Sequence, residues 1–317
     1  MEEQEHQSTE DQTKPELLFH YTRQKGLDGI LKDKCIWATH YRFLNDSTER
    51  QHGLALYKRV ISSVAIKQFG SVESAKTLVE YLQRSYSDIF DTYIVCFSTS
   101  YSKEDYKKKR QSGDWTGGDR LSQWRGYAPG SQGYCLAFDF QLVQQIQQLP
   151  QNRKCSYYGF CMYTEESKRQ LVETHVNEIF ESHFRGLSVK DLKSPESLHE
   201  ALMQNQPKID RRTEFAFDML SLCGILKHDG FQEENEYRLI KFMFQSKPNS
   251  DKVCFRPDNT PYIEHRINLA AANSPLRAIF VGPSANTDHA AYGLQLRLNE
   301  MGLSHVKVIP SDIPYRG

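Results

Sequence analysis

The run Thr92–Thr99 (TYIVCFST) constrains the fold more than any other segment of the chain. It consists mainly of β-branched and aromatic residues, and it is too short for a helix that buries one face. A continuous apolar run of this kind is typical of a strand that is buried on both faces. The sequence therefore predicts a sheet that has this segment near its centre.

Other segments supply the strands and helices around this centre. Short apolar runs predict further strands at 17–21, 36–38, 133–138, 155–163, 237–244, 277–281 and 305–309. Helical spacing and capping residues predict helices at 26–32, from 46 or 47 to 70, 72–90, 140–148 and 288–301, and mainly helical chain from 165 to 227. The polar segment 1–14 is predicted to be a disordered tail. We expect a single α+β domain over residues 15–317, in which residues 165–228 form a helical insertion or subdomain.

Composition excludes several classes of protein. With 40 basic and 40 acidic residues the formal net charge is zero, so no global field attracts nucleic acid or a membrane. The seven cysteines form no CxxC pair, which favours free thiols in a reducing cytoplasm over disulfides or a zinc cluster. We expect a cytoplasmic protein with no signal peptide and no membrane span. The chain has no P-loop, GxGxxG, HExxH or GxSxG motif, which removes the commonest hydrolase, Rossmann and zinc-protease classes.

Polar side chains at the end of the first predicted strand form one candidate wall of a ligand pocket. His20 and Thr22 are two residues apart and point to the same face of an extended chain, with Tyr21 on the other face. A histidine and a hydroxyl can bind a ribose, and an aromatic ring can stack on a flat ligand. A core histidine followed by a helix-capping threonine is the structural alternative. Downstream, Asn45 and Glu49 could orient a ligand, although a helix N-terminus explains this acidic segment equally well.

The segment Ser122–Tyr127 (SQWRGY) follows a long polar loop and is a more specific candidate. Gln123 and Arg125 supply hydrogen-bond donors, and an arginine can bind a phosphate through two parallel hydrogen bonds. Trp124 and Tyr127 supply rings for stacking, and the glycine between Arg125 and Tyr127 lets the backbone approach a ligand. Few core packings place Gln, Trp and Arg in succession, so ligand binding is favoured over a structural role.

A pair of glutamates precedes the strand predicted at 237–244. Glu234 and Glu236 are two residues apart and would face the same side of a strand start, where neighbouring carboxylates raise a pKa and require a cation. Arg238, again two residues on, is the expected cation. A solvated acidic loop with Arg238 in a salt bridge is the structural alternative. The basic run in loop 101–120 is either solvated or holds a polyanionic target near the pocket.

In combination and order, these motifs resemble a bacterial family that is catalogued only as a domain of unknown function. The resemblance covers roughly residues 17–315, and no single motif within it is specific. The motifs are Phe19-His20-Tyr21-Thr22, Asn45-Asp46 with Glu49, Cys96-Phe97-Ser98, Gln123-Trp124-Arg125-Gly126-Tyr127, Glu234-x-Glu236-Tyr237-Arg238 and Val281-Gly282-Pro283. The family label implies no chemistry by itself.

A more distant resemblance does imply chemistry. His20-x-Thr22 followed by Leu27-x-x-Ile30-Leu31 resembles the first strand and helix of ADP-ribosyltransferases, a superfamily that includes DNA-modifying toxins. This resemblance implies a split mixed sheet with flanking helices, to which the helical region 165–228 is an insertion. It also implies that NAD is the substrate. His20 and Thr22 would then hold the nicotinamide ribose, and Glu236 would orient it from the start of a late strand.

The same resemblance assigns the remaining candidate residues. Ser98 begins a segment similar to the superfamily's Ser-Thr-Ser element, and Tyr21, Trp124 or Tyr127 is the ring that stacks on nicotinamide. Glu236 and Glu234 are the expected catalytic residues. The expected NAD-binding residues are His20, Tyr21, Thr22, Asn45, Ser98, Gln123, Trp124, Arg125, Tyr127 and Arg238.

Three functions follow as hypotheses. The first is an NAD-dependent ADP-ribosyltransferase that needs no metal and modifies a nucleic-acid or protein target presented by the basic loop 101–120. Such an enzyme is expected to be a toxin or antiviral-defence effector with a regulatory or antitoxin partner. The alternative is a non-catalytic nucleotide-sensing or protein-interaction module. The third is a nuclease with Glu234, Glu236 and Asp46 around Mg²⁺, ranked last because no third carboxylate is placed locally.

Overall fold

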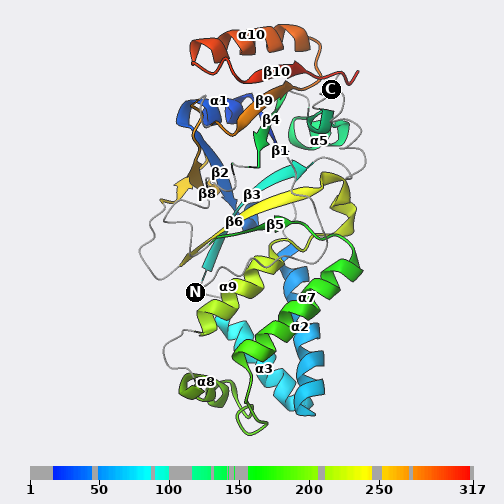
Figure 1. The fold of residues 1–317 in the computed structure, drawn as a ribbon, viewed down its shortest axis with the longest axis vertical. Coiled ribbons are helices and arrows are strands. Elements are labelled where there is room, and N and C mark those ends of the chain that lie inside the picture. Colours follow the sequence, from blue (N-terminus) through cyan, green and yellow to red (C-terminus); the bar gives the residue numbers. More distant parts are fainter. Residues whose placement is uncertain are drawn as a thin grey trace.

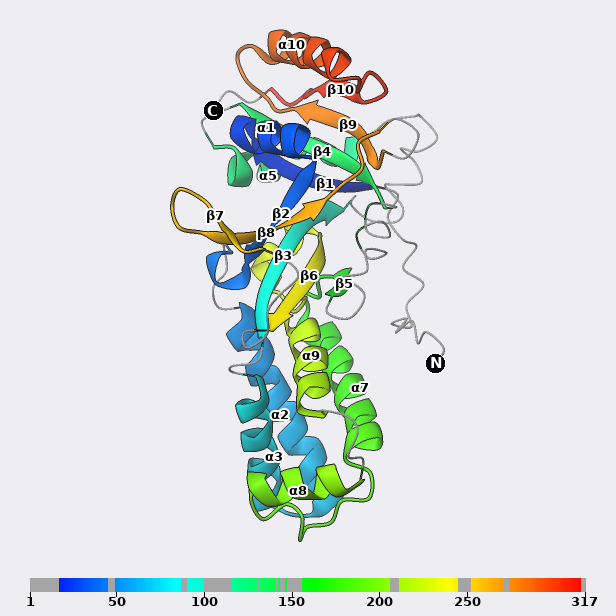
Figure 2. The same cartoon turned by 90° about the vertical axis from the view of Figure 1, so that its left-hand side faces the viewer.

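The protein is elongated, with a sheet and its covering helices at one end and a body of helices at the other (Figure 1, Figure 2). The computed structural model describes residues 17–44, 49–86, 90–99, 116–129, 132–140, 142, 146, 156–205, 211–244, 252–270 and 274–314. The predicted tail 1–14, most of loop 101–120 and most of the predicted helix 140–148 lie outside these ranges. In the described part, no helix is long and apolar enough to cross a membrane.

The sheet contains ten strands in the described residues. They are β1 (Leu17–Arg23), β2 (Cys35–His40), β3 (Phe90–Thr99), β4 (Gly133–Asp139), β5 (Ser156–Phe160), β6 (Glu236–Phe244), β7 (Cys254–Phe255), β8 (Pro261–Arg266), β9 (Leu276–Val281) and β10 (Lys307–Pro310). The main path runs β10-β9-β4-β1-β3-β2-β8-β7, and β6 pairs with both β3 and β5. Neighbouring strands are antiparallel except β9 and β10, which are parallel. The prediction of an α+β fold with a mixed sheet is confirmed.

Strand β3 is the place where the sheet divides. One edge of β3 pairs with β6 along its length, from Phe90 opposite Phe244 to Ser98 opposite Glu236. The other edge is shared, because β1 pairs with the end of β3 at Ser98 and Thr99 whereas β2 pairs with Tyr93 and Ile94. Residues 95–97 of β3 therefore have a strand on only one side. The sheet opens into a fork between β1 and β2 at this point.

Helices cover the sheet at both ends of the molecule. The described helices are α1 (Gln24–Asp33), α2 (Glu49–Phe69), α3 (Val72–Tyr86), α5 (Leu121–Tyr127), α7 (Glu165–His183), α8 (Pro195–Asn205), α9 (Arg211–Cys223) and α10 (Thr287–Glu300), with single 3₁₀ turns at Tyr41–Phe43, Thr116–Gly118 and Asp229–Glu234. Figure 2 shows α2, α3, α7 and α9 side by side below the sheet, with α8 across their far end. The helix predicted at 72–90 ends at Tyr86, and Phe90 already belongs to β3.

The helices of region 165–228 share their core with α2 and α3. Tyr57 and Leu78 from the first pair of helices lie in the same buried cluster as Val176 and Leu220. Strand β6 contributes Ile240 and Phe242 to this cluster, while Leu239 and Met243, which alternate with them, belong to a second core above the sheet. The helical region therefore packs as one body with α2 and α3. Its status as a separate subdomain stays a prediction.

Candidate functional site

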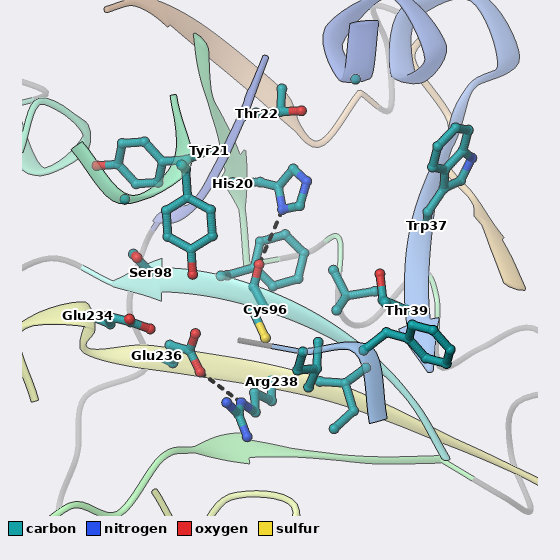
Figure 3. Close-up of a pocket in the computed structure, with 18 of the residues that line it drawn as sticks. His20, Tyr21, Thr22, Trp37, Thr39, Cys96, Ser98, Glu234, Glu236 and Arg238 are labelled. Carbon is teal, nitrogen blue, oxygen red and sulfur yellow. Dashed lines mark hydrogen bonds and ion pairs between the residues drawn. The ribbon is translucent and has the colours of Figure 1, made fainter. Parts of the chain in front are cut away.

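A cavity of about 740 Å³ lies at the fork of the sheet, which is a volume in the ordinary range for small-molecule sites. Its walls come from β1, from β2, from residues 94–98 of β3, and from the first residues of β6. The tip of the β7–β8 hairpin, at 256–258, closes one side. Figure 3 shows the side chains of β1 and β2 on opposite sides of the opening, with β3 and β6 below them.

His20 forms the β1 wall in one defined protonation state. Its Nδ1 lies 3.2 Å from the carbonyl oxygen of Cys96, at the point where β3 lacks a neighbouring strand. A carbonyl can only accept, so Nδ1 carries the proton and Nε2 is left as an acceptor. Burial lowers the pKa of His20 below its usual 6.5, although the bond to Cys96 opposes this shift. At neutral pH, His20 is thus a neutral ring that can accept a hydrogen bond from a ligand hydroxyl.

Thr22 lies on the same face of β1 as His20 and also lines the cavity, as the strand alternation predicts. The first turn of α1 passes directly behind it. A Cβ atom on Gly26 would overlap the Thr22 hydroxyl, so only glycine at this position leaves the threonine in place. The close approach of helix and strand keeps the two polar side chains of β1 at the cavity wall.

The aromatic candidates separate into two groups. Tyr21 and Tyr127 line the cavity and stack on each other, with ring centroids 6.1 Å apart. Tyr21 donates a hydrogen bond to the carbonyl oxygen of Gly118 at 2.9 Å. Trp124 is not among the cavity-lining residues and instead contacts Tyr21 edge to face at 5.0 Å. Its indole nitrogen donates to Asp119 at 2.7 Å, so it anchors the chain behind the cavity.

Gln123 and Arg125 point away from each other. They are two positions apart on helix α5, and each position turns the side chain by about 100°, so they diverge by about 200°. Gln123 is buried and accepts a hydrogen bond of 3.2 Å from Ser98, which itself lines the cavity. Arg125 is exposed and is not a lining residue. From segment 122–127, Tyr127 and the adjacent Gly126 reach the cavity wall. The candidate Asn45 lies outside the described residues.

A buried cluster of charges forms the opposite end of the cavity. Arg238 donates to both carboxylate oxygens of Glu49, at 2.6 and 3.0 Å, and to Glu236 at 2.8 Å. Lys227 lies 2.6 Å from Glu234, 3.2 Å from Glu236 and 3.7 Å from Glu49. Three carboxylates thus surround two cations. The side chains of Arg238 and Glu236 are only 2% and 3% exposed, so their charges are compensated within the protein.

The two glutamates converge for a reason that differs from the predicted strand alternation. Glu234 ends a 3₁₀ turn, and β6 begins only at Glu236. Between them Asn235 has a left-handed backbone with a φ of 44°, and its carbonyl oxygen accepts hydrogen bonds from the Thr99 amide and hydroxyl, each at 2.9 Å. This turn, fixed to the end of β3, folds Glu234 back beside Glu236. Lys227 then bridges both carboxylates.

The environment drives the pKa values of the two glutamates apart. Burial would raise the pKa of Glu236, but the charges of Arg238 and Lys227 outweigh it and lower the pKa to about 2. Burial and the neighbouring charge of Glu236 raise the pKa of Glu234 to about 7, despite its contact with Lys227. A carboxylate that stays ionised beside one that titrates near neutrality is an arrangement suited to acid–base chemistry.

Glu49, a candidate for orienting a ligand, is buried against Arg238. Three other residues of the cavity were not identified as ligand contacts from the sequence alone. Lys227 supplies the second cation, and Trp37 and Arg256 line the side near β2. Glu49 is also a third carboxylate beside Glu234 and Glu236. In the described residues, no group of three or more His, Cys, Asp or Glu is placed to hold a metal ion.

Residues 123–239 match a family described as "Protein of unknown function (DUF2971)". This match supports the resemblance to a family of unknown function, and its range contains the turn and the start of the strand that carry Glu234, Glu236 and Arg238. No curated protein matches the chain, and no solved structure matches it. The likeness to ADP-ribosyltransferases therefore stays a prediction.

Proposed function

We propose that the protein is an ADP-ribosyltransferase-like enzyme that cleaves NAD in the cavity at the fork of the sheet. One observation carries this proposal. His20 of β1, whose Nε2 is left as an acceptor, and the carboxylates of Glu234 and Glu236 at the start of β6 line a single cavity. A ribose placed between them would meet a hydrogen-bond acceptor on one side and negative charge on the other.

The proposed reaction uses the two glutamates in different roles. The bond between ribose C1′ and the nicotinamide nitrogen breaks, and its electron pair leaves with nicotinamide. Glu236, ionised because its pKa lies at about 2, stabilises the positive charge that develops on the ribose. The acceptor forms the new bond to C1′ and gives its proton to Glu234, whose pKa of about 7 suits a general base. Tyr127 is the ring that we propose stacks on nicotinamide, and the buried ring of Tyr21 supports it from behind.

The charge of the cluster supports this division of roles. Glu49, Glu234 and Glu236 carry three negative charges when all are ionised, against the two positive charges of Lys227 and Arg238. The cluster then has one negative charge in excess, at the end of the cavity where a cationic ribose would form. With Glu234 protonated, the excess disappears. The ionisation of Glu234 therefore decides two things: whether a general base is present, and whether the cluster has a net negative charge.

The acceptor and the biological role are proposed from the resemblance alone. We propose a nucleic-acid or protein acceptor that the basic loop 101–120 presents, and a role as a toxin or antiviral-defence effector in the cytoplasm. A regulatory or antitoxin partner would then restrain the activity. These proposals depend on the chemistry at the cavity, which is the part that can be tested first.

The decisive experiment is incubation of the protein with labelled NAD and cell extract. We expect release of nicotinamide together with transfer of label to a macromolecule. Glu236→Gln should lower both by about 10²–10³-fold, because it removes a charge that acts on the transition state. Glu233→Gln is the matched control, because Glu233 is an exposed carboxylate of the same turn. If wild type releases no nicotinamide, or if Glu236→Gln is as active as Glu233→Gln, the enzyme proposal is wrong.

One observation favours a second candidate function, a nucleotide sensor without turnover. Glu236 is already held by Arg238 at 2.8 Å and Lys227 at 3.2 Å, so its charge is largely compensated by the protein itself. A pocket with these contacts can bind a nucleotide without cleaving it. Thermal stabilisation by NAD with no release of nicotinamide would support the sensor over the enzyme.

A further inference from the structure

Arg256 offers an unused hydrogen-bond donor at the side of the cavity near β2. Its terminal Nη2 donates to the Thr39 hydroxyl at 2.8 Å, and its guanidinium carbon lies 5.6 Å from the centre of the Trp37 ring. Its Nε is buried and has no hydrogen-bond partner among the described residues. Because a buried guanidinium donor without an acceptor costs free energy, this atom marks a place for a ligand acceptor.

The hairpin around Arg256 holds the side chain in one orientation. The Arg256 amide donates to the Thr260 carbonyl, and the Asn259 amide donates to the Arg256 carbonyl, both at 2.9 Å. The carboxylate of Asp258, the acidic residue of this turn, accepts from the Thr260 amide at 3.1 Å and so belongs to the turn itself. The guanidinium of Arg256, a residue of the cavity wall, is therefore positioned before any ligand arrives.

The Trp37 ring makes a cation–π contact with the same guanidinium. The ring stacks on Tyr262 of the neighbouring strand, with centroids 4.3 Å apart and an interplanar angle of 27°. A tryptophan that is fixed in this way offers a rigid face for a cation. Arg256 is thus held by a hydroxyl, an aromatic ring and its own hairpin, while Nε remains available.

The strand register places this donor well away from the glutamates. Thr39, the partner of Arg256, pairs with Ile94, whereas Glu236 pairs with Ser98 on the same strand. Four residues along a strand correspond to about 13 Å. A ligand with a ribose at Glu236 must therefore extend along β3 to reach Arg256. A dinucleotide has this length and carries its negative charges in the middle.

Other groups add positive potential to the cavity. Lys25 and Gly26, in the first turn of α1, line it. Within the described residues, no side chain caps this helix, so its first amides keep their donor capacity. The positive end of the helix dipole and a lysine thus add to the positive charge of Arg256 at the cavity wall. Together these groups favour an anionic ligand.

We propose that Arg256 is the phosphate-binding residue of the cavity, that Thr39 and Trp37 position it, and that its ligand is the pyrophosphate of a dinucleotide. The identity of the ligand as a dinucleotide rests on the proposed function. The anion site itself rests on the geometry of Arg256 alone, so the two ideas can fail separately.

The test is calorimetric binding of ADP-ribose, inorganic pyrophosphate and adenosine to the full chain. We expect wild type to bind the first two, and Arg256→Gln to weaken both by about 10- to 100-fold, as for the loss of a charge-assisted hydrogen bond. Adenosine carries no phosphate, and its binding should be the same in both proteins. Arg256→Lys should be intermediate, since it keeps the charge without the planar fork. Arg266→Gln is the matched control, because Arg266 is exposed at the end of the same hairpin.

The outcomes separate the two ideas. If Arg256→Gln unfolds at the same temperature as wild type and binds ADP-ribose equally well, Arg256 is not the phosphate-binding residue. If wild type binds neither ADP-ribose nor pyrophosphate, the cavity has no anion site, and the proposal fails. If binding depends on Arg256 but wild type releases no nicotinamide from NAD, the anion site stands and only the enzyme proposal fails.

Discussion

Glu234 and Glu236 are separated by one residue, yet they occupy different electrostatic environments. Glu236 is held by Arg238 and Lys227 and stays ionised, since its pKa lies at about 2. Glu234 contacts Lys227 but lies beside the negative charge of Glu236, which helps to raise its pKa to about 7. Small changes in pH near neutrality therefore change the charge of one glutamate and leave the other unchanged. Any chemistry at this end of the cavity should follow that single titration.

The first consequence is a pH dependence of NAD cleavage. A general base acts only when it is deprotonated, so kcat/KM should rise with pH through about 7 and level off above it. His20 does not account for this rise, because burial lowers its pKa below 6.5 and it is already neutral in this range. Glu234→Gln should abolish the rise and lower the rate by about 10²–10⁴-fold. The measurement is nicotinamide release between pH 5 and 9.

The control for this profile is Glu233→Gln, which changes an exposed carboxylate of the same turn and should keep the wild-type curve. A flat wild-type profile would contradict the assignment of Glu234 as the base. So would a rise through the same pH in the Glu234→Gln variant, because another group would then be titrating.

At the scale of elements, the ion pair between Arg238 and Glu49 joins β6 to the first turn of α2. The two residues are 189 positions apart, and both are buried, with side chains 2% and 8% exposed. The guanidinium makes two parallel bonds to the Glu49 carboxylate and a third to Glu236. This contact fixes where the helical body begins relative to the strand that carries the glutamates.

Loss of this ion pair should be costly to stability. Arg238→Met leaves Glu49 and Glu236 as buried carboxylates without their guanidinium, and we expect a loss of about 3–5 kcal/mol in the free energy of unfolding. Urea denaturation at 25 °C measures it. Arg169→Met breaks an exposed pair with Glu173 on α7 and should leave stability unchanged within error. If the two variants are equally stable, the buried cluster does not hold α2 against β6.

The sequence predicts those strands that can be recognised from a pattern of apolar and polar residues within the strand itself. Thr92–Thr99 is a continuous apolar run, and β3 is indeed buried from both sides, with Ile94 in the helical core and Val95 in the core above. The first strand and helix are equally visible, because His20 and Thr22 alternate with Tyr21. By contrast, β8 begins with a proline and buries His265 where an apolar residue would be recognised, so its alternation is hidden.

The candidate site divides in the same way. His20 and Thr22 could be found because strand geometry places residues two positions apart on one face. The same spacing pointed to the two glutamates, although the turn at Asn235 brings them together and strand alternation does not. Arg256 could not be found, because it enters the cavity only through its bond to Thr39, 217 residues distant. For Trp124 the prediction came from the residue type, and its contacts in the structure do not support it. Its aromatic ring suggests stacking on a ligand, whereas the turn at Asp119 holds it behind the wall.

At the scale of the molecule, β3 and β6 are shared between the two main hydrophobic cores. Ile240 and Phe242 of β6 face the helical body, while Leu239 and Met243 face the core around α1 and α10. The cavity opens at the end of these strands where the sheet forks. A ligand in the cavity therefore contacts strands that belong to both halves of the molecule. Binding should therefore stabilise both halves.

ADP-ribose at 100 times its Kd should raise the free energy of unfolding by about 2.7 kcal/mol. Hydrogen exchange should show where this stabilisation acts. We expect slower exchange in β1, at the end of β3 and at the start of β6, because all three contribute described residues to the cavity. Helix α10 contributes none of the described lining residues and packs at the end of the sheet against β9 and β10, so its exchange should change least (Figure 1). Equal protection of α10 and β1 would indicate that the ligand binds elsewhere or stabilises the fold only globally.

Protection of β1 and β6 that is lost in Arg256→Gln would connect the fork of the sheet to the phosphate-binding end of the same cavity.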